Sequence, residues 1–98
     1  MVRYSQYMGA VKLVPTGSIN VELTNRPARI TKTYMLRDNA DFSVLITRLI
    51  TRVYGSAAAH SRRDDSYSKS EGLRRWDGIV LGRDLTITEL KNPTTATA

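Results

Sequence analysis

The sequence DFSVLITRLITRVYG, residues 41–55, carries the clearest structural pattern in the chain. Apolar side chains recur three or four positions apart, at Phe42, Leu45, Ile46, Leu49, Ile50 and Val53. This spacing places one apolar stripe along an α-helix. Asp41 precedes the stripe as a candidate N-cap, and Gly55 follows it as a candidate stop. The pattern therefore predicts an amphipathic helix that must bury its stripe against another element.

The sequence on both sides of this helix alternates between apolar and polar residues, as β-strands do. Residues 11–13 and 19–23 flank a Pro-Thr-Gly turn and predict a hairpin. Residues 28–37 predict a third strand, whose apolar face is interrupted by a lysine. Residues 79–81 and 85–90 flank a Gly-Arg-Asp turn and predict a second hairpin. We therefore predict an α+β fold, a small antiparallel sheet of about five strands with one amphipathic helix packed on it.

The length and composition indicate one domain. The chain has 98 residues and a hydrophobic content of 41%, enough for a single modest core. We expect a compact domain over residues 1–90 and a flexible tail over residues 91–98. Residues 56–72 are rich in Ser, Ala, Arg and Asp and show little periodicity. They predict a mobile loop, with a short turn of helix within residues 57–63.

Several classes of site and location are excluded or disfavoured. The chain has no cysteine, which excludes disulfides, thiol catalysis and zinc sites built on cysteine. No apolar run approaches the length of a membrane span, and the first residues lack the apolar core of a secretory signal. We therefore expect a soluble intracellular protein, in either the cytoplasm or the nucleus.

The sequence is strongly basic, and most of the positive charge comes from arginine. The formal net charge is +6 at pH 7, and the sequence pI is about 10.1. Arginine binds phosphates through paired hydrogen bonds, and neutralising phosphates releases counterions. We therefore expect a nucleic acid or another polyanion as partner, and no small-molecule cofactor. The candidate contact residues are Arg48, Arg52, Arg62, Arg63, Arg74, Arg75 and Trp76.

A second interpretation of these candidates stays open. Arg62 and Arg63 are followed at once by Asp64 and Asp65, which can neutralise them locally. Trp76 is able to stack on an unpaired base, but tryptophan is also a common core residue. The basic surface and the aromatic platform are therefore predictions that depend on which side chains the fold leaves outside.

The second hairpin suggests an alternative chemistry. If its turn is centred on the arginine of Gly-Arg-Asp, Asp77 stands opposite Glu89, with Lys91 on the same face. Paired carboxylates hold divalent cations, and a lysine steadies phosphate charge. The arrangement resembles the PD-(D/E)xK nuclease pattern, and Glu-Leu-Lys-Asn-Pro from Glu89 looks like the corresponding strand in type I restriction motor subunits. The resemblance implies Mg²⁺- or Mn²⁺-dependent phosphodiester cleavage, with Asp77, Glu89 and Lys91 as its residues. The other interpretation is a pair of exposed ion pairs, Asp77 with Arg75 and Glu89 with Lys91.

Assembly is a third class of function. Small strand-rich proteins often associate through sheet edges or apolar strips. The candidates for such a strip are Tyr4, Tyr7, Met8 and Met35. The compact, cysteine-free, arginine-rich chain also broadly resembles small viral accessory or matrix proteins. We favour a basic, non-enzymatic binding module that forms a homo-oligomer, with the nuclease and a self-assembling structural or adaptor protein as alternatives.

Overall fold

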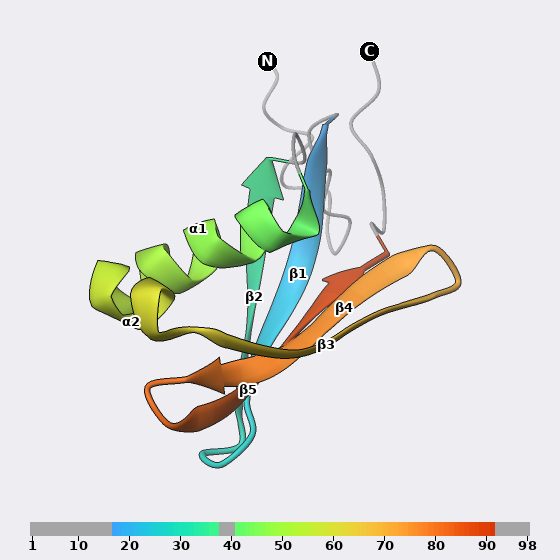
Figure 1. Ribbon diagram of the computed structural model, residues 1–98. Coiled ribbons are helices and arrows are strands. Elements are labelled where there is room, and N and C mark those ends of the chain that lie inside the picture. Colours follow the sequence, from blue (N-terminus) through green and yellow to red (C-terminus); the bar gives the residue numbers. More distant parts are fainter. Residues whose placement is uncertain (1–16, 38–40, 92–98) are drawn as a thin grey trace.

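A computed structural model describes residues 17–37 and 41–91 of the chain. Over these residues, five antiparallel strands form one open sheet and two helices pack on it (Figure 1). In chain order, the elements are β1 Ser18–Asn25, β2 Ile30–Arg37, α1 Phe42–Tyr54, α2 Ser56–Ser61, β3 Arg63–Ser70, β4 Leu73–Val80 and β5 Arg83–Leu90. The predicted α+β class, with about five antiparallel strands, is confirmed.

The strands lie in the order β2-β1-β5-β4-β3. β1 and β5 lie near opposite ends of the described chain, yet they pair at the centre of the sheet. β2 and β3 are the two edges, and the two helices connect them. α1 lies beside β2, where Arg52 lies over the Tyr34 ring, and α2 contacts β4.

Helix α1 forms where the apolar stripe predicts it. The first five stripe residues are buried and Val53 is half-buried. The Asp41 side chain makes no capping bond; instead its backbone carbonyl accepts hydrogen bonds from the N–H groups of Val44 and Leu45. Gly55 ends the helix with a φ of 100°, which glycine adopts without a side-chain clash.

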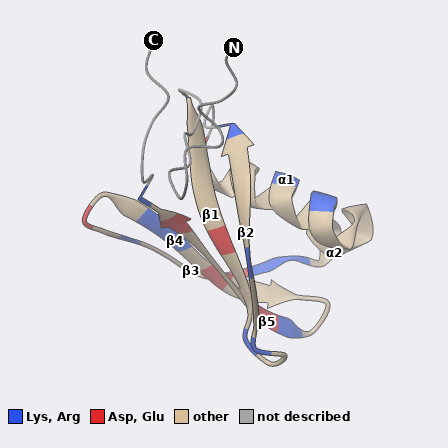
Figure 2. Ribbon diagram, turned by 180° about the vertical axis from the view of Figure 1, so that it is seen from behind, with Lys and Arg blue, Asp and Glu red and all other residues tan. Residues whose placement is uncertain are grey.

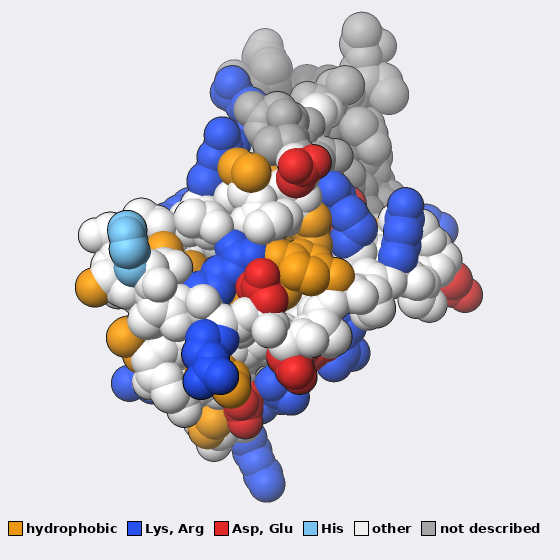
Figure 3. Space-filling model, viewed as in Figure 1, with side chains coloured by type: hydrophobic (Ala, Val, Ile, Leu, Met, Phe, Trp, Pro, Cys, Tyr) orange, Lys and Arg blue, Asp and Glu red, His pale blue; other side chains and the backbone are white. Residues whose placement is uncertain are grey.

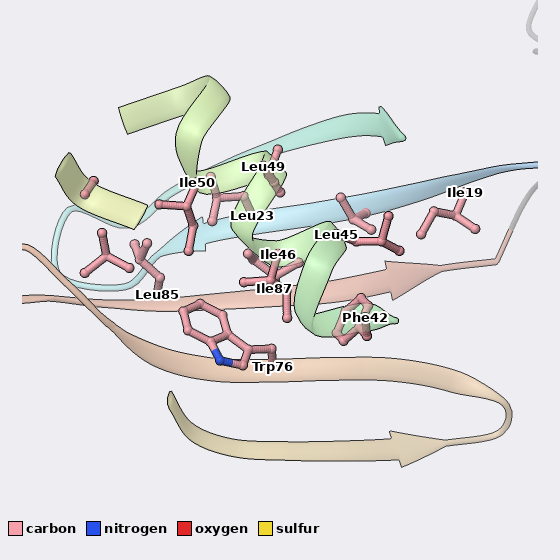
Figure 4. Close-up of a cluster of buried hydrophobic side chains, with 13 residues drawn as sticks. Ile19, Leu23, Phe42, Leu45, Ile46, Leu49, Ile50, Trp76, Leu85 and Ile87 are labelled. Atoms are coloured by element: carbon pink, nitrogen blue, oxygen red, sulfur yellow. The ribbon is translucent and has the colours of Figure 1, made fainter. Parts of the chain in front are cut away.

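The core lies between α1 and three strands (Figure 4). The strand residues that meet the helix are Ile19, Val21 and Leu23 of β1, Trp76 and Val80 of β4, and Leu85 and Ile87 of β5. On β1 the buried side chains alternate with half-buried polar ones, as expected when a helix covers only one face of a sheet. The other face carries no described helix (Figure 2).

The prediction of a loop over residues 56–72 is wrong. Its first part is helix α2, which contains the predicted helical turn, and most of the rest is strand β3. Every residue of β3 is exposed, and β3 is an edge strand with a neighbouring strand on one side only. Such a strand has no buried face and therefore shows no apolar alternation. A two-residue turn, Glu71 and Gly72, both at positive φ, joins it to β4.

The first hairpin also differs from the prediction. Residues 11–13 lie outside the described residues. β1 has β2 on one side and β5 on the other, so both of its edges are already paired. Residues 19–23 therefore form their hairpin with the following strand, not the preceding one. In the connecting turn, the Asn25 side chain accepts a hydrogen bond from the Ala28 N–H at 3.2 Å, and Arg29 has a φ of 57°. An asparagine before such a turn stabilises it locally.

Candidate nucleic-acid interface

Arg62 is a structural residue, contrary to its predicted role. Its guanidinium lies over the Trp76 ring, 5.5 Å from the ring centroid, and its side chain is only 8% exposed. Its nitrogens donate to Ser43 and Thr47 of α1 and to Asp64 and Tyr67 of β3. All three nitrogens are engaged within the protein, so Arg62 connects the first half of α1 to β3 and has no N–H group left for a phosphate.

Trp76 is a core residue, which corrects its predicted stacking role. The side chain is 0% exposed, and Nε1 donates to Asp64 Oδ1 at 2.8 Å. The indole ring crosses Gly78 on the same strand. A Cβ atom at Gly78 would come within 2.1 Å of the ring and 2.5 Å of the Arg63 carbonyl oxygen. Glycine is therefore required at this position, and a base cannot reach the buried ring.

Arg74 and Arg75 point to opposite faces of β4 because adjacent strand residues alternate. Arg74 Nε lies 2.9 Å from Glu89 Oε1, and its guanidinium lies over Phe42 on the helix face. Arg75 Nε lies 2.9 Å from Asp77 Oδ2 on the other face. The two arginines therefore do not share a surface, and each has a carboxylate partner.

The same guanidinium contacts keep three carboxyl groups charged. Hydrogen bonding to the adjacent guanidinium is the main cause that lowers the pKa of Asp64 and of Asp77. Burial raises the pKa of Glu89, but the hydrogen bonds and charge of Arg74 outweigh it, and the net shift is downward. At the centre of the helix face, acidic side chains adjoin basic ones (Figure 3). The positive charge of this region is therefore largely compensated by neighbouring negative charge.

The second hairpin has a different register from the predicted one. Leu81 and Gly82 form its two-residue turn, with φ values of 53° and 76°, as in a type I′ hairpin. Asp77 is consequently paired with Thr86, three residues from the predicted partner Glu89. A shift by an odd number of residues moves a side chain to the other face of the sheet.

The residues of the nuclease alternative therefore lie apart. Asp77 is on the open face, where it pairs with Arg75, as the second interpretation expected. Glu89 is on the helix face and pairs with Arg74, not with the exposed Lys91 that follows β5. Within residues 17–37 and 41–91, no three His, Cys, Asp or Glu side chains gather to hold a metal ion. The prediction that Asp77 and Glu89 face each other across the hairpin is wrong.

A different set of basic residues lies between α1 and the edge strand β2. Arg52 lies over the Tyr34 ring, 5.8 Å from its centroid, and Arg48 is exposed one helical turn earlier. Lys32 is two residues from Tyr34 and therefore on the same face of β2. Among the described residues, no carboxylate lies within salt-bridge distance of Lys32 or Arg52. We call Lys32, Tyr34, Arg48 and Arg52 the α1–β2 surface.

A hollow adjoins the α1–β2 surface. Its volume is about 230 Å³, and it lies between the last turn of α1 and the adjoining ends of β1 and β2. Its lining residues are Leu23, Asn25, Ile30, Lys32, Tyr34, Val53 and Tyr54. Ile30 is 53% exposed, so the hollow is open on the side of β2. Aromatic and apolar walls therefore meet basic groups at one place.

The predicted contact residues thus have different environments. Arg48 and Arg52 lie on the α1–β2 surface, and Arg63 is exposed on the opposite edge strand, β3. Lys32, which interrupts the apolar face of β2, was missed as a contact residue, although the interruption was visible in the sequence. An inward-facing lysine on a strand is typical of a sheet edge, and that pattern was the available signal.

No protein-family model matches the chain, and no curated protein or solved structure matches it significantly either. In the part of the chain that the structure describes, neither helix is both long and apolar enough to cross a membrane. What the protein binds must therefore be inferred from the charges and shape of its own surface.

Proposed function

We propose that this chain is a binding module for single-stranded nucleic acid or a similar flexible polyanion, and that the α1–β2 surface makes the contact. The observation that carries the proposal is the charge of two adjacent elements. β2 and α1 together contain four basic residues and no acidic residue; three of them, Lys32, Arg48 and Arg52, lie on the α1–β2 surface, and Arg37 points to the other face of β2. Phosphates approaching this side meet positive charge without a competing carboxylate from either element.

Half-buried aromatic rings beside exposed guanidinium groups favour a single strand over a duplex. Tyr34 and Tyr54 are half-buried at the edge of the surface, where their rings adjoin the hollow. Unpaired bases stack on such rings, whereas bases in a duplex already stack on each other.

The test is the salt dependence of binding. Fluorescence anisotropy with labelled dT12 is measured between about 50 and 200 mM salt, where each phosphate contact steepens the slope of log K against log salt by about 0.7 for a single strand. The variant Arg52→Gln is expected to reduce the slope by nearly this amount and to weaken binding about 5-fold at the lowest salt.

Arg63→Gln is the matched control, because it removes the same charge from an exposed arginine on the opposite edge strand. Its affinity is expected to stay within about 2-fold of wild type. Equal losses from Arg52→Gln and Arg63→Gln would show a diffuse charge effect instead of a binding surface. Affinity that is independent of salt would remove the electrostatic proposal altogether.

Self-association stays a prediction. Tyr4, Tyr7 and Met8 lie outside the described residues, and Met35 is 49% exposed on β2. Both sheet edges carry features that oppose pairing with another sheet: Lys32 on β2, and an irregular register between Asp64 and Ser66 on β3. Light scattering at several protein concentrations measures the oligomeric state directly.

A further inference from the structure

The hollow beside the α1–β2 surface has the size and walls of a site for one planar ring system. Its volume of about 230 Å³ is below the range of roughly 300 to 1,000 Å³ that is typical of sites for drug-sized ligands. Leu23, Ile30 and Val53 supply apolar walls, and Tyr34 and Tyr54 supply aromatic ones. A single flat group buries its faces in such a space, whereas a longer apolar segment would extend beyond it.

The charges around the hollow indicate what this planar group is attached to. Lys32 belongs to the lining, and Arg52 lies over Tyr34, which is also part of the lining. A base in a nucleic acid carries a phosphate on each side, so its insertion would bring phosphates toward these two cations. A second copy of this chain is a poorer occupant, because a symmetric interface through the α1–β2 surface would bring the positive charges of two identical surfaces together.

Asn25 and Lys32 supply hydrogen-bond donors to the lining, and the hydroxyls of Tyr34 and Tyr54 donate or accept. The Asn25 side-chain oxygen already accepts a hydrogen bond from the Ala28 N–H, so its amide NH₂ is the group left for a ligand. Lys32 can only donate. Carbonyl oxygens on a base edge accept from these donors, whereas adenine has only ring nitrogens as acceptors and its exocyclic amino group donates. Because Arg52 already lies over Tyr34, stacking is assigned to Tyr54.

We propose that this hollow binds one unpaired base with carbonyl groups on its edge, such as thymine or uracil, from a single-stranded nucleic acid. The proposal rests on the proposed function and adds to it a site that reads one base. The phosphates supply affinity that is independent of sequence, and the hollow adds a preference for one kind of base.

The experiment compares three labelled 12-mers with equal numbers of phosphates: dT12, dA12 and a 12-mer of abasic tetrahydrofuran units. Wild type is expected to bind dT12 about 10-fold more tightly than the abasic strand, from the stacking of one base, and more tightly than dA12. Equal, salt-dependent affinity for dT12 and the abasic strand would overturn the base site and leave the proposed function standing. Binding of none of the three would instead remove the proposed function.

Two variants at Tyr54 test whether the hollow causes the difference in affinity between dT12 and the abasic strand. Tyr54→Leu keeps an apolar side chain in the wall and is expected to abolish the difference between dT12 and the abasic strand. Tyr54→Phe keeps the ring and is expected to preserve the difference. A difference that survives in Tyr54→Leu, with thermal unfolding like that of wild type, would place base recognition elsewhere.

Lys32→Met is a second test of the base site. Because Lys32 is exposed, this variant does not disturb a packed side chain. The variant loses a donor and is expected to lower the ratio of dT12 to dA12 affinity about 3-fold or more. An unchanged ratio, or equal affinity of wild type for dT12 and dA12, would overturn the assignment of a carbonyl-bearing base. If Tyr54→Leu instead changes the oligomeric state in light scattering, the occupant is a second copy and the proposal fails.

Discussion

Two parts of the molecule, strands β3 to β5 on one side and β2 with α1 on the other, carry similar numbers of arginines, four and three, but offer very different surfaces. β3, β4 and β5 together contain five basic and five acidic residues, and three of those carboxylates accept hydrogen bonds from a guanidinium. β2 and α1 contain four basic residues and no acidic residue. Seen from behind, neither α1 nor β2 carries a red residue, although Glu22 of β1 lies beside β2, whereas red and blue mix on β3, β4 and β5 (Figure 2). The number of arginines in a segment therefore does not predict its surface potential; the position of nearby carboxylates does.

Neighbouring residues show the same difference on a smaller scale. Arg62 is almost fully buried between α1 and Trp76, while the next residue, Arg63, is exposed on the edge of the sheet. Arg74 and Arg75 face opposite sides of one strand. Two adjacent arginines on a strand cannot serve one ligand, because their side chains alternate. A pair of adjacent arginines in the sequence is thus weak evidence for a common binding surface.

The largest expected effect comes from Trp76. Trp76→Ala removes the largest side chain of the core and the hydrogen bond to Asp64, and should lower the free energy of unfolding by about 3 to 5 kcal/mol. Urea denaturation followed by circular dichroism measures the loss. If Trp76 instead served as a surface platform, the variant would keep its stability and lose affinity for dT12. That result would place nucleic-acid binding on β3 to β5 and not on β2 and α1.

A smaller effect is expected from Arg62. Arg62→Met keeps an apolar stem over Trp76 but leaves the Asp64 carboxylate and the Tyr67 hydroxyl without their guanidinium, at an expected cost of about 2 to 3 kcal/mol. Arg52→Met is the control from the other part, since Arg52 is exposed and has no carboxylate partner among the described residues. Its stability should stay within about 0.5 kcal/mol of wild type. Similar stability losses in both variants would contradict the distinction between Arg62 as a structural residue and Arg52 as a surface residue.

The smallest effect is the dependence of stability on pH. Asp64, Asp77 and Glu89 have folded-state pKa values below their ordinary ones, so their contribution is complete above the unfolded pKa values and is lost as the pH falls through the folded ones. Unfolding free energy should therefore decline below about pH 4, by up to about 1 kcal/mol for each of the three pairs. Asp77→Asn, measured in the same urea titrations from pH 2 to 7, should flatten part of this decline. A profile identical to that of wild type would show that the pair with Arg75 is not formed in solution.

Much of the fold could be predicted because buried residues leave a periodic pattern. The stripe from Phe42 to Val53 predicted α1, and alternation predicted β1, β2 and β5. β3 was missed because an exposed edge strand selects polar residues on both faces and so resembles a loop in composition. The position of the second hairpin turn was also missed, since Leu81 is an unusual residue for the left-handed conformation it adopts there.

The amino-acid sequence by itself determines the fold class, the helix that organises the core and the excess of positive charge, because these depend on local periodicity and composition. Only the tertiary structure decides which arginines remain available. A guanidinium is equally basic wherever it stands in the chain, but its partner is set by strand register and by which elements pack together. For this reason Arg62 stabilises the core while Arg52, ten residues earlier, lies on the surface proposed to bind nucleic acid.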